Sequence, residues 1–149
     1  MKKTDIYLGL GSNIGDRHTY LLKAIELLVN RVGTLVRSSS FIESEPQGFE
    51  SAHSFLNAVV LLQTTLTPRE LLKETQQIER ELGRTDKRSN DTKDTKPVYH
   101  DRTIDIDILI YGDQHIDEPD LQIPHPRIEE RAFVMVPLRE VQTPTGRIF

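Results

Sequence analysis

The sequence contains no cysteine and no apolar run long enough to cross a membrane. The absence of cysteine excludes a disulfide framework, a thiolate metal site and a cysteine nucleophile, and it fits a reducing cytoplasm. Neither the serine elbow G-x-S-x-G nor the zinc motif H-E-x-x-H occurs, so nothing indicates a serine hydrolase or a zinc peptidase. The first residues are too charged for a signal peptide, and their apolar run is too short. We therefore expect a cytoplasmic protein with no membrane partner.

An excess of positive charge is also missing. Lysine and arginine total 19 against 23 aspartate and glutamate residues, which gives a net charge of −4. A general nucleic-acid binder is usually basic, so we expect no nucleic-acid partner. A nucleotide site built from a few local arginines remains compatible with this balance.

The order of the predicted elements indicates an α+β fold in a single domain, residues 1–149. Alternating and helical apolar patterns follow one another as β-α-β-β-α-β, the order of a ferredoxin-like sandwich with an antiparallel sheet and helices on one face. A C-terminal extension with a short helix near residues 127–133 follows, and we expect a monomer. The expected strands cover residues 4–10, 35–43, 55–64 and 102–112, and the expected helices cover residues 16–30 and 67–82.

The strand over residues 102–112 has the most informative pattern. Its isoleucines at 104, 106, 108 and 110 face one side, while Asp105 and Asp107 stand on the other with Tyr111 at its far end. The Cα atoms of the two aspartates lie about 6.5–7 Å apart. Magnesium bound with phosphates uses one or two carboxylates, and the remaining ligands are phosphate oxygens and water. An edge strand with solvated acids would give the same pattern. The strand alone leaves both interpretations open.

Gly9 lies near the end of the first expected strand, and Gly11 and Gly15 follow it before the first helix. Their spacing is one residue longer than the dinucleotide fingerprint, and no Gly-Lys-Ser/Thr ending follows. We interpret the segment as a tight turn that uses the positive φ angles open to glycine.

Two residues of the apolar third strand could serve a flat ligand. Phe55 and Asn57 are two residues apart, so a ring and an amide face the same side. A buried asparagine needs hydrogen-bond partners. Either a neighbouring loop satisfies Asn57, or the amide is offered to a polar heterocycle.

The remaining polar candidates are weak one by one. Gln76 and Glu79 share a helix surface, which fits a solvated face. His125 lies between two prolines and precedes basic helix residues, and together with Arg84 and Arg102 these could surround an anionic substrate. Residues 84–100 are long and charged for a loop within one domain, which is typical of a functional lid or a disordered segment.

These segments together resemble the 6-hydroxymethyl-7,8-dihydropterin pyrophosphokinase family. The resemblance spans nearly the whole chain, and the motif with the paired aspartates and a leading arginine is specific. The matching segments are LGLGSNIGD at 8–16, SFIESEPQG at 40–48, FLNA at 55–58, QQIE at 76–79, GR at 83–84, RTIDIDI at 102–108, IPH at 123–125 and RAF at 131–133.

The resemblance implies a pyrophosphoryl transfer from ATP to the hydroxymethyl group of a reduced pterin, with AMP released. It assigns two Mg²⁺ ions to Asp105 and Asp107, which with Arg84 and Arg102 would be the catalytic residues. The lid would close over the site. The pterin would contact Ser44, Glu45, Gln47, Phe55, Asn57 and Phe133. ATP would contact Gln76, Glu79, Arg84, Arg102, Ile108, His125 and Arg131.

Some positions depart from the family pattern. Tyr99 stands where many members have a tryptophan, and Asp86 and Lys87 lie where a second arginine follows Gly-Arg. Pro126 replaces a residue that is often aromatic. Phe55 replaces a tyrosine of some members, a change that keeps ring stacking. Two other classes would fit the aspartate pair, a non-catalytic ferredoxin-like module that binds metal or nucleotide and a metal-dependent phosphohydrolase.

Overall fold

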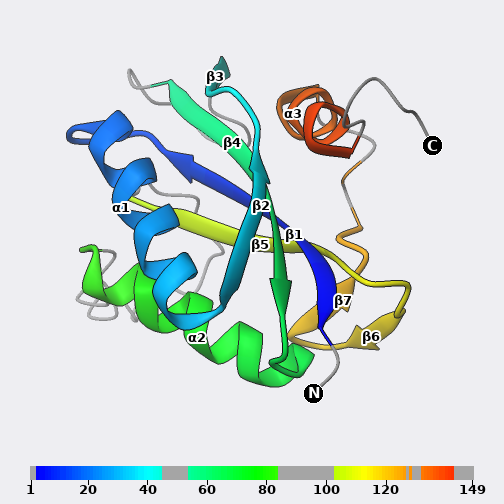
Figure 1. Ribbon diagram of the computed structural model, residues 1–149. Coiled ribbons are helices and arrows are strands. Elements are labelled where there is room, and N and C mark those ends of the chain that lie inside the picture. The colour runs from blue at the N-terminus through cyan, green and yellow to red at the C-terminus, as the bar shows by residue number, and fades with distance from the viewer. Residues whose placement is uncertain (1–2, 45–53, 84–102, 127, 129–131, 143–149) are drawn as a thin grey trace.

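The computed structural model describes residues 3–44, 54–83, 103–126, 128 and 132–142. These residues form one sheet with helices on both faces and a small hairpin at one side (Figure 1). The strands of the main sheet are β1 (Thr4–Ser12), β2 (Gly33–Ser38), β3 (Ile42–Ser44), β4 (Phe55–Thr64) and β5 (Asp105–Tyr111). The helices are α1 (Arg17–Arg31), α2 (Pro68–Glu81) and α3 (Ala132–Gln142), and the hairpin pairs β6 (Ile116–Glu118) with β7 (Leu121–Ile123).

The sheet has the order β2-β4-β1-β5, with β3 also paired to β4, and its pairings are antiparallel. Each helix of the two β-α-β units returns the chain to a strand that does not neighbour the one it left. This is the ferredoxin-like arrangement, so the predicted fold class is confirmed. The central strands are β1 and β4, and β5 is an edge strand.

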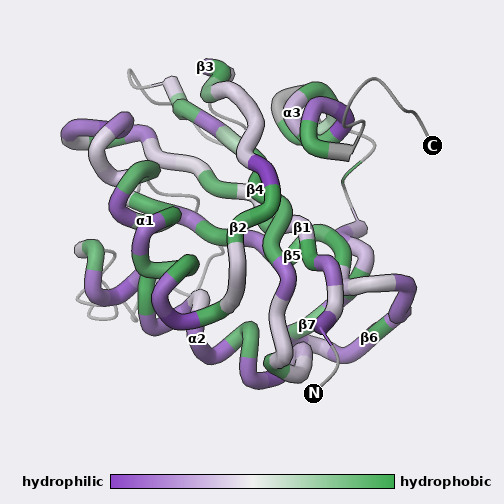
Figure 2. Tube along the Cα trace, viewed as in Figure 1, coloured by the Kyte–Doolittle hydropathy of each residue, from purple (hydrophilic) through white to green (hydrophobic). Residues whose placement is uncertain are grey.

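Helices α1 and α2 cover one face of the sheet (Figure 1). Alternate residues of the two central strands point toward them, because side chains of a strand alternate between faces. Hydrophobic stretches recur between hydrophilic ones along both helices (Figure 2), as expected where one side of a helix is buried. The main core contains Ile6, Leu8, Leu10, Leu21, Leu28, Val60, Leu62, Leu71, Ile78, Ile106 and Ile108, among others.

Both covering helices begin where the sequence predicts. The side chain of Asp16 caps α1 by accepting a hydrogen bond from the Thr19 amide. Thr67 caps α2 in a capping box, in which the side chains of Thr67 and Glu70 each accept a hydrogen bond from the other residue's backbone amide. These caps satisfy amide groups that have no partner within the helix. Gly83, with φ of 102°, follows the end of α2. Within the described residues, no helix is long and apolar enough to span a membrane.

Helix α3 packs on the opposite face of the sheet (Figure 1). Val134, Leu138 and Val141 contact Val59 and Leu61 of β4 in a second core. The short helix expected over 127–133 lies mostly outside the described residues, and the described helix α3 runs from Ala132 through Pro137 to Gln142, farther than expected. Proline interrupts the hydrogen bonds of a helix interior, so Pro137 carries a cost there. Packing on the sheet outweighs that cost.

The predicted second strand, residues 35–43, is two strands rather than one. Ser39 lies between them, and its amide donates to the Val59 carbonyl while its hydroxyl accepts from the Val59 amide. A side-chain oxygen thus takes the place of a backbone carbonyl and interrupts the ladder. The chain then continues along β4 as β3.

The alternation predicted for residues 102–112 holds only as far as Ile108. The pairing of β1 with β5 passes from Tyr7–Ile110 to Leu8–Ile108, so Leu109 is an extra residue in a β-bulge. Beyond this bulge, the even-numbered and odd-numbered side chains of β5 exchange faces of the sheet. Ile110 packs in the α3 core, and Tyr111 lies in the main core, opposite to the prediction for both.

Candidate functional site

Asp105 and Asp107 lie side by side on the face of the sheet that also bears α3. Both are half-buried, and each stands opposite a glycine of the central strand β1. Within the described residues, no group of three or more acidic or histidine side chains could hold a metal ion. Mg²⁺ bound with phosphates commonly has one or two carboxylate ligands and completes its shell with water and phosphate oxygens, so the two aspartates could serve such an ion. The residue types fit that ion.

The opposing glycines were assigned wrongly to a tight turn. Strand β1 continues to Ser12, so Gly9 and Gly11 are strand residues, and among the three glycines of the segment Gly15 alone has a positive φ, 75°. Gly11 pairs with Asp105 on one side and Asn57 on the other. The sequence signal was the two-residue spacing of the first two glycines, which puts both on the face of the aspartates.

Phe55 and Asn57 reach the same face from β4. A Cβ atom at Gly11 would lie 3.3 Å from Asn57 Oδ1 and 3.4 Å from Phe55 Cδ1, so both side chains lean over the glycine. Neighbouring strands are about 4.8 Å apart, which places Asn57 and Asp105 about 10 Å apart across β1. The structure thus brings the predicted stacking and amide groups to the same face as the predicted metal ligands.

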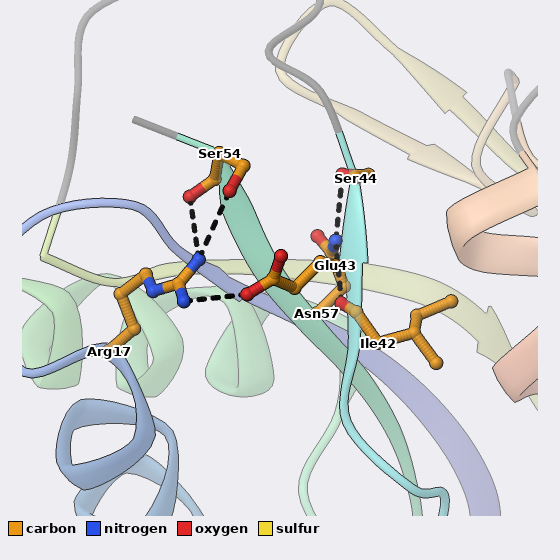
Figure 3. Close-up of polar contacts among 6 residues, drawn as sticks. All are labelled: Arg17, Ile42, Glu43, Ser44, Ser54 and Asn57. Atoms are coloured by element: carbon orange, nitrogen blue, oxygen red, sulfur yellow. Dashed lines mark hydrogen bonds and ion pairs between the residues drawn. The ribbon is translucent and has the colours of Figure 1, made fainter. Parts of the chain in front are cut away.

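Asn57 is buried, and its amide orientation is fixed by β3. Its Nδ2 donates to Ser44 Oγ at 2.8 Å and to the Ile42 carbonyl at 3.3 Å (Figure 3). Both N–H groups are thereby used, which directs the Oδ1 acceptor toward Gly11. The two interpretations of Asn57 are compatible, because neighbours satisfy the donors while the oxygen can accept from a ligand.

Glu79 is not on a solvated face, contrary to the simplest reading of its helix. The residue is only 6% exposed, and its Oε2 accepts from the Ile106 amide at 2.7 Å. Ile106 lies between the two aspartates on β5, which is an edge strand of the sheet formed by the described residues, so the Glu79 carboxylate takes the place of a strand carbonyl for this amide. Gln76, one turn earlier, is exposed.

His125 reaches the same edge of the sheet from the segment after β7. Its backbone amide donates to the carbonyl of the bulged residue Leu109 at 2.9 Å, and the residue is half-buried. Ile108 has a buried side chain in the main core, on the opposite face from the aspartates. Only its main chain is therefore available to a ligand at the edge.

Several predicted site residues lie outside the described residues. They are Glu45, Gln47, Arg84, Arg102 and Arg131, together with the predicted lid over 84–100. Phe133 is the second residue of α3, but its side chain is not described. The far end of this helix is fastened to the sheet, where Arg37 Nε donates to the Val141 carbonyl and Ser40 donates to Glu140.

Known proteins resemble this chain over most of its length. A "2-amino-4-hydroxy-6-hydroxymethyldihydropteridine pyrophosphokinase" from Porphyromonas gingivalis is 52% identical over 137 residues, covering 91% of this chain and 89% of that protein. The protein with the same description from Bacillus subtilis is 45% identical over 136 residues, covering 91% and 76%.

A crystal structure of Plasmodium falciparum HPPK-DHPS superimposes with a TM-score of 0.69 at 16% identity. The match covers 93% of this chain and 40% of that longer chain, and at this identity it supports the fold alone. The family described as "7,8-dihydro-6-hydroxymethylpterin-pyrophosphokinase (HPPK)" matches residues 7–143. Because this match covers most of the chain and both bacterial relatives align along most of their own length, the chain belongs to the 7,8-dihydro-6-hydroxymethylpterin-pyrophosphokinase family.

Proposed function

We propose that this protein is a magnesium-dependent diphosphokinase of folate biosynthesis. It transfers the pyrophosphoryl group of ATP to 6-hydroxymethyl-7,8-dihydropterin and yields AMP and the pterin diphosphate. The observation that supports this most directly is the shared face of Asp105, Asp107, Phe55 and Asn57 in a chain of this family. One face of the sheet thus presents a phosphate-metal platform and a site for a flat polar ring about 10 Å apart.

The pterin is proposed to lie against Phe55 and Asn57. The ring of Phe55 offers a stacking surface, and the fixed Oδ1 of Asn57 can accept from an N–H group of the pterin edge. Ser44 holds the Asn57 amide in that orientation. The remaining proposed pterin contacts are Glu45, Gln47 and Phe133.

ATP is proposed to lie along β5, at the edge of the described sheet. Asp105 and Asp107 would hold two Mg²⁺ ions, which when bound neutralise charge on the phosphates. Glu79 and His125 flank this strand, and both already make contacts to its backbone. The other proposed nucleotide contacts are Gln76, Arg84, Arg102, Ile108 and Arg131, and Arg84 and Arg102 are also proposed to act in catalysis.

The reaction needs no nucleophile from the protein. The hydroxyl oxygen of the pterin attacks the β-phosphorus of ATP and loses its proton to solvent, the bond to the α,β-bridging oxygen breaks, and AMP leaves with that oxygen. Phosphoryl transfer asks the protein chiefly to position the reactants and to balance charge. The chain's own contribution is to hold the ring at Phe55 and Asn57, while the aspartates would hold the Mg²⁺ ions that neutralise the phosphates. We also propose that residues 1–149 act as one domain, in a cytoplasmic monomer.

The proposal is tested by incubating the protein with ATP, Mg²⁺ and 6-hydroxymethyl-7,8-dihydropterin. We expect AMP and a pterin diphosphate in equal amounts. Formation of ADP or free phosphate, or turnover that does not depend on pterin, would instead indicate one of the competing classes. Omission of Mg²⁺ with a chelator present should abolish the product.

The metal assignment is tested by Asp105→Ala and Asp107→Ala. Each should lower kcat by on the order of a hundredfold or more, because a ligand of the catalytic ion is lost. Asp113→Ala is the matched control, since this exposed aspartate follows β5 by two residues. A near-normal rate in either site variant, or an equal loss in the control, would refute the assignment.

A further inference from the structure

Arg17 joins the two chain segments that flank residues 45–53. This first residue of α1 donates from Nη1 to the Ser54 carbonyl oxygen at 3.0 Å and to Ser54 Oγ at 3.3 Å. From Nη2 it donates to Glu43 Oε2 at 2.8 Å. Figure 3 shows the guanidinium group directed at Ser54 and at the Glu43 carboxylate, which extends toward it.

The two contacted residues directly adjoin the proposed pterin site. Glu43 precedes Ser44, which accepts from the Asn57 amide, and Ser54 precedes Phe55. Ser44 and Phe55 are also opposite one another in the pairing of β3 with β4. Because β3 is only three residues long, few backbone hydrogen bonds hold it in place. Any shift of this strand would move the partner that orients Asn57.

The shape of the arginine side chain suits this connection. A guanidinium group is planar and carries five donors in a fixed fork, so one group can bond two segments at once. A lysine ammonium group is a compact point charge and does not reproduce that geometry. The Arg17 side chain is 28% exposed and Glu43 is 60% exposed, so the ion pair itself should add little to global stability. The main effect of the contacts of Arg17 is instead to fix the distance between Glu43 and Ser54.

We propose that Arg17 is a positioning residue for the pterin pocket. By bonding to Glu43 and Ser54 together, it fixes the end of β3 relative to the start of β4, and therefore the placement of the Asn57 amide and the Phe55 ring. The inference rests on the proposed pterin site. It assigns Arg17 no contact with either substrate.

The first test measures steady-state kinetics of Arg17→Ala and Arg17→Lys. Both variants should raise the KM for pterin about tenfold, as loss of a supporting contact commonly does, while the KM for ATP stays within about twofold. Melting temperatures should remain close to that of the parent protein. A pterin KM that does not change would overturn the proposal. A normal pterin KM in Arg17→Lys would overturn it too, because charge alone would then suffice.

Arg31→Ala supplies a matched control on the same helix. Arg31 forms a two-pronged ion pair with Glu81 at the other end of α1, and its side chain is exposed to a similar degree, 32%. This variant should leave both KM values unchanged. If it raised the pterin KM as much as Arg17→Ala, the effect would be general loosening of α1 rather than positioning.

A double variant separates failure of this inference from failure of the pterin site. If Arg17 acts through the pocket, Arg17→Ala/Asn57→Ala should weaken pterin binding by less than the sum of the two single losses, since the orientation of the amide no longer matters. Fully additive losses would contradict the inference. An Asn57→Ala variant with a normal pterin KM would instead contradict the proposed pterin site.

Discussion

Phe55 and Asn57 lean over the central strand because Gly11 has no side chain to hold them away. The distance of 3.3 Å from a Cβ at this position to Asn57 Oδ1 is tighter than ordinary packing, whereas the 3.4 Å to Phe55 Cδ1 is a close contact. A methyl group would therefore displace the amide oxygen by a few tenths of an ångström. Asn57 has little freedom to move, because both of its N–H groups are bonded to β3.

Gly11→Ala should therefore raise the KM for pterin by about tenfold, because small misplacements of positioning groups are costly in catalysis. The KM for ATP should change much less. Gly9→Ala is the comparison, since its Cβ would meet only the Leu109 side chain at 3.4–3.6 Å, an ordinary contact. Steady-state kinetics with each substrate varied in turn would measure this. Equal pterin KM values in the two variants would refute the role given to Gly11.

At the scale of elements, sequence patterns predicted those parts whose signals are local. Strand β4 has the predicted bounds because most of its ten residues are apolar and the strand ends before a capping threonine. Helix α2 begins as predicted because the capping box of Thr67 and Glu70 is a motif of four consecutive residues. Such features depend on neighbours in the chain, so they can be read without knowing the tertiary structure.

Features that depend on the partner strand could not be read in this way. The isoleucine alternation continues unbroken through Leu109, and only the pairing with β1 creates the bulge there. Likewise Glu79 has the pattern of a solvated helix position, and its burial follows from its place beside the edge of β5. The candidate site residues on strands were predictable as a set, whereas the pairing of Gly9 and Gly11 with the aspartates and the contacts of Arg17 emerge only from the folded arrangement.

The contact between Glu79 and β5 should contribute measurably to stability. Glu79→Ala would leave the Ile106 amide without its carboxylate acceptor, so we expect the free energy of unfolding to fall by about 1–3 kcal/mol. Glu79→Gln keeps an oxygen acceptor and should lose less. Urea unfolding without nucleotide measures this separately from any role in ATP binding. Gln76→Ala, an exposed change on the same helix, is the control and should stay within about 0.5 kcal/mol of the parent.

At the scale of the whole molecule, exposed ion pairs connect elements distant in the sequence. Arg69 of α2 bonds Asp120 at 2.8–2.9 Å and also Glu118 in the β6–β7 hairpin. The Arg69 guanidinium beside Asp120 holds the pKa of that carboxyl below its ordinary value of 3.8. Arg31 of α1 similarly lowers the pKa of Glu81 on α2. Helix α2 is thereby linked to the hairpin and to α1.

The sign of these shifts predicts how Arg69 affects stability as pH changes. A carboxyl whose pKa is lower in the folded state contributes stability that is present above its unfolded pKa and is lost as pH falls through the folded value. Arg69→Met should therefore lower the melting temperature most at neutral pH, and the difference from the parent should narrow as pH falls below about 4. Thermal unfolding followed by circular dichroism across pH 7 to 2.5 would measure it, at low salt because both partners are exposed.

The control for this prediction is Arg80→Met on the same helix. Arg80 donates to the neutral amide of Gln77, so its removal should change the melting temperature by a similar amount at each pH. Added salt should shrink the difference caused by Arg69→Met and leave that of Arg80→Met largely unaltered, because screening acts on charge pairs. If the difference in melting temperature between Arg69→Met and the parent stayed constant down to pH 2.5, the ion pair of Arg69 with Asp120 would not be what links α2 to the hairpin.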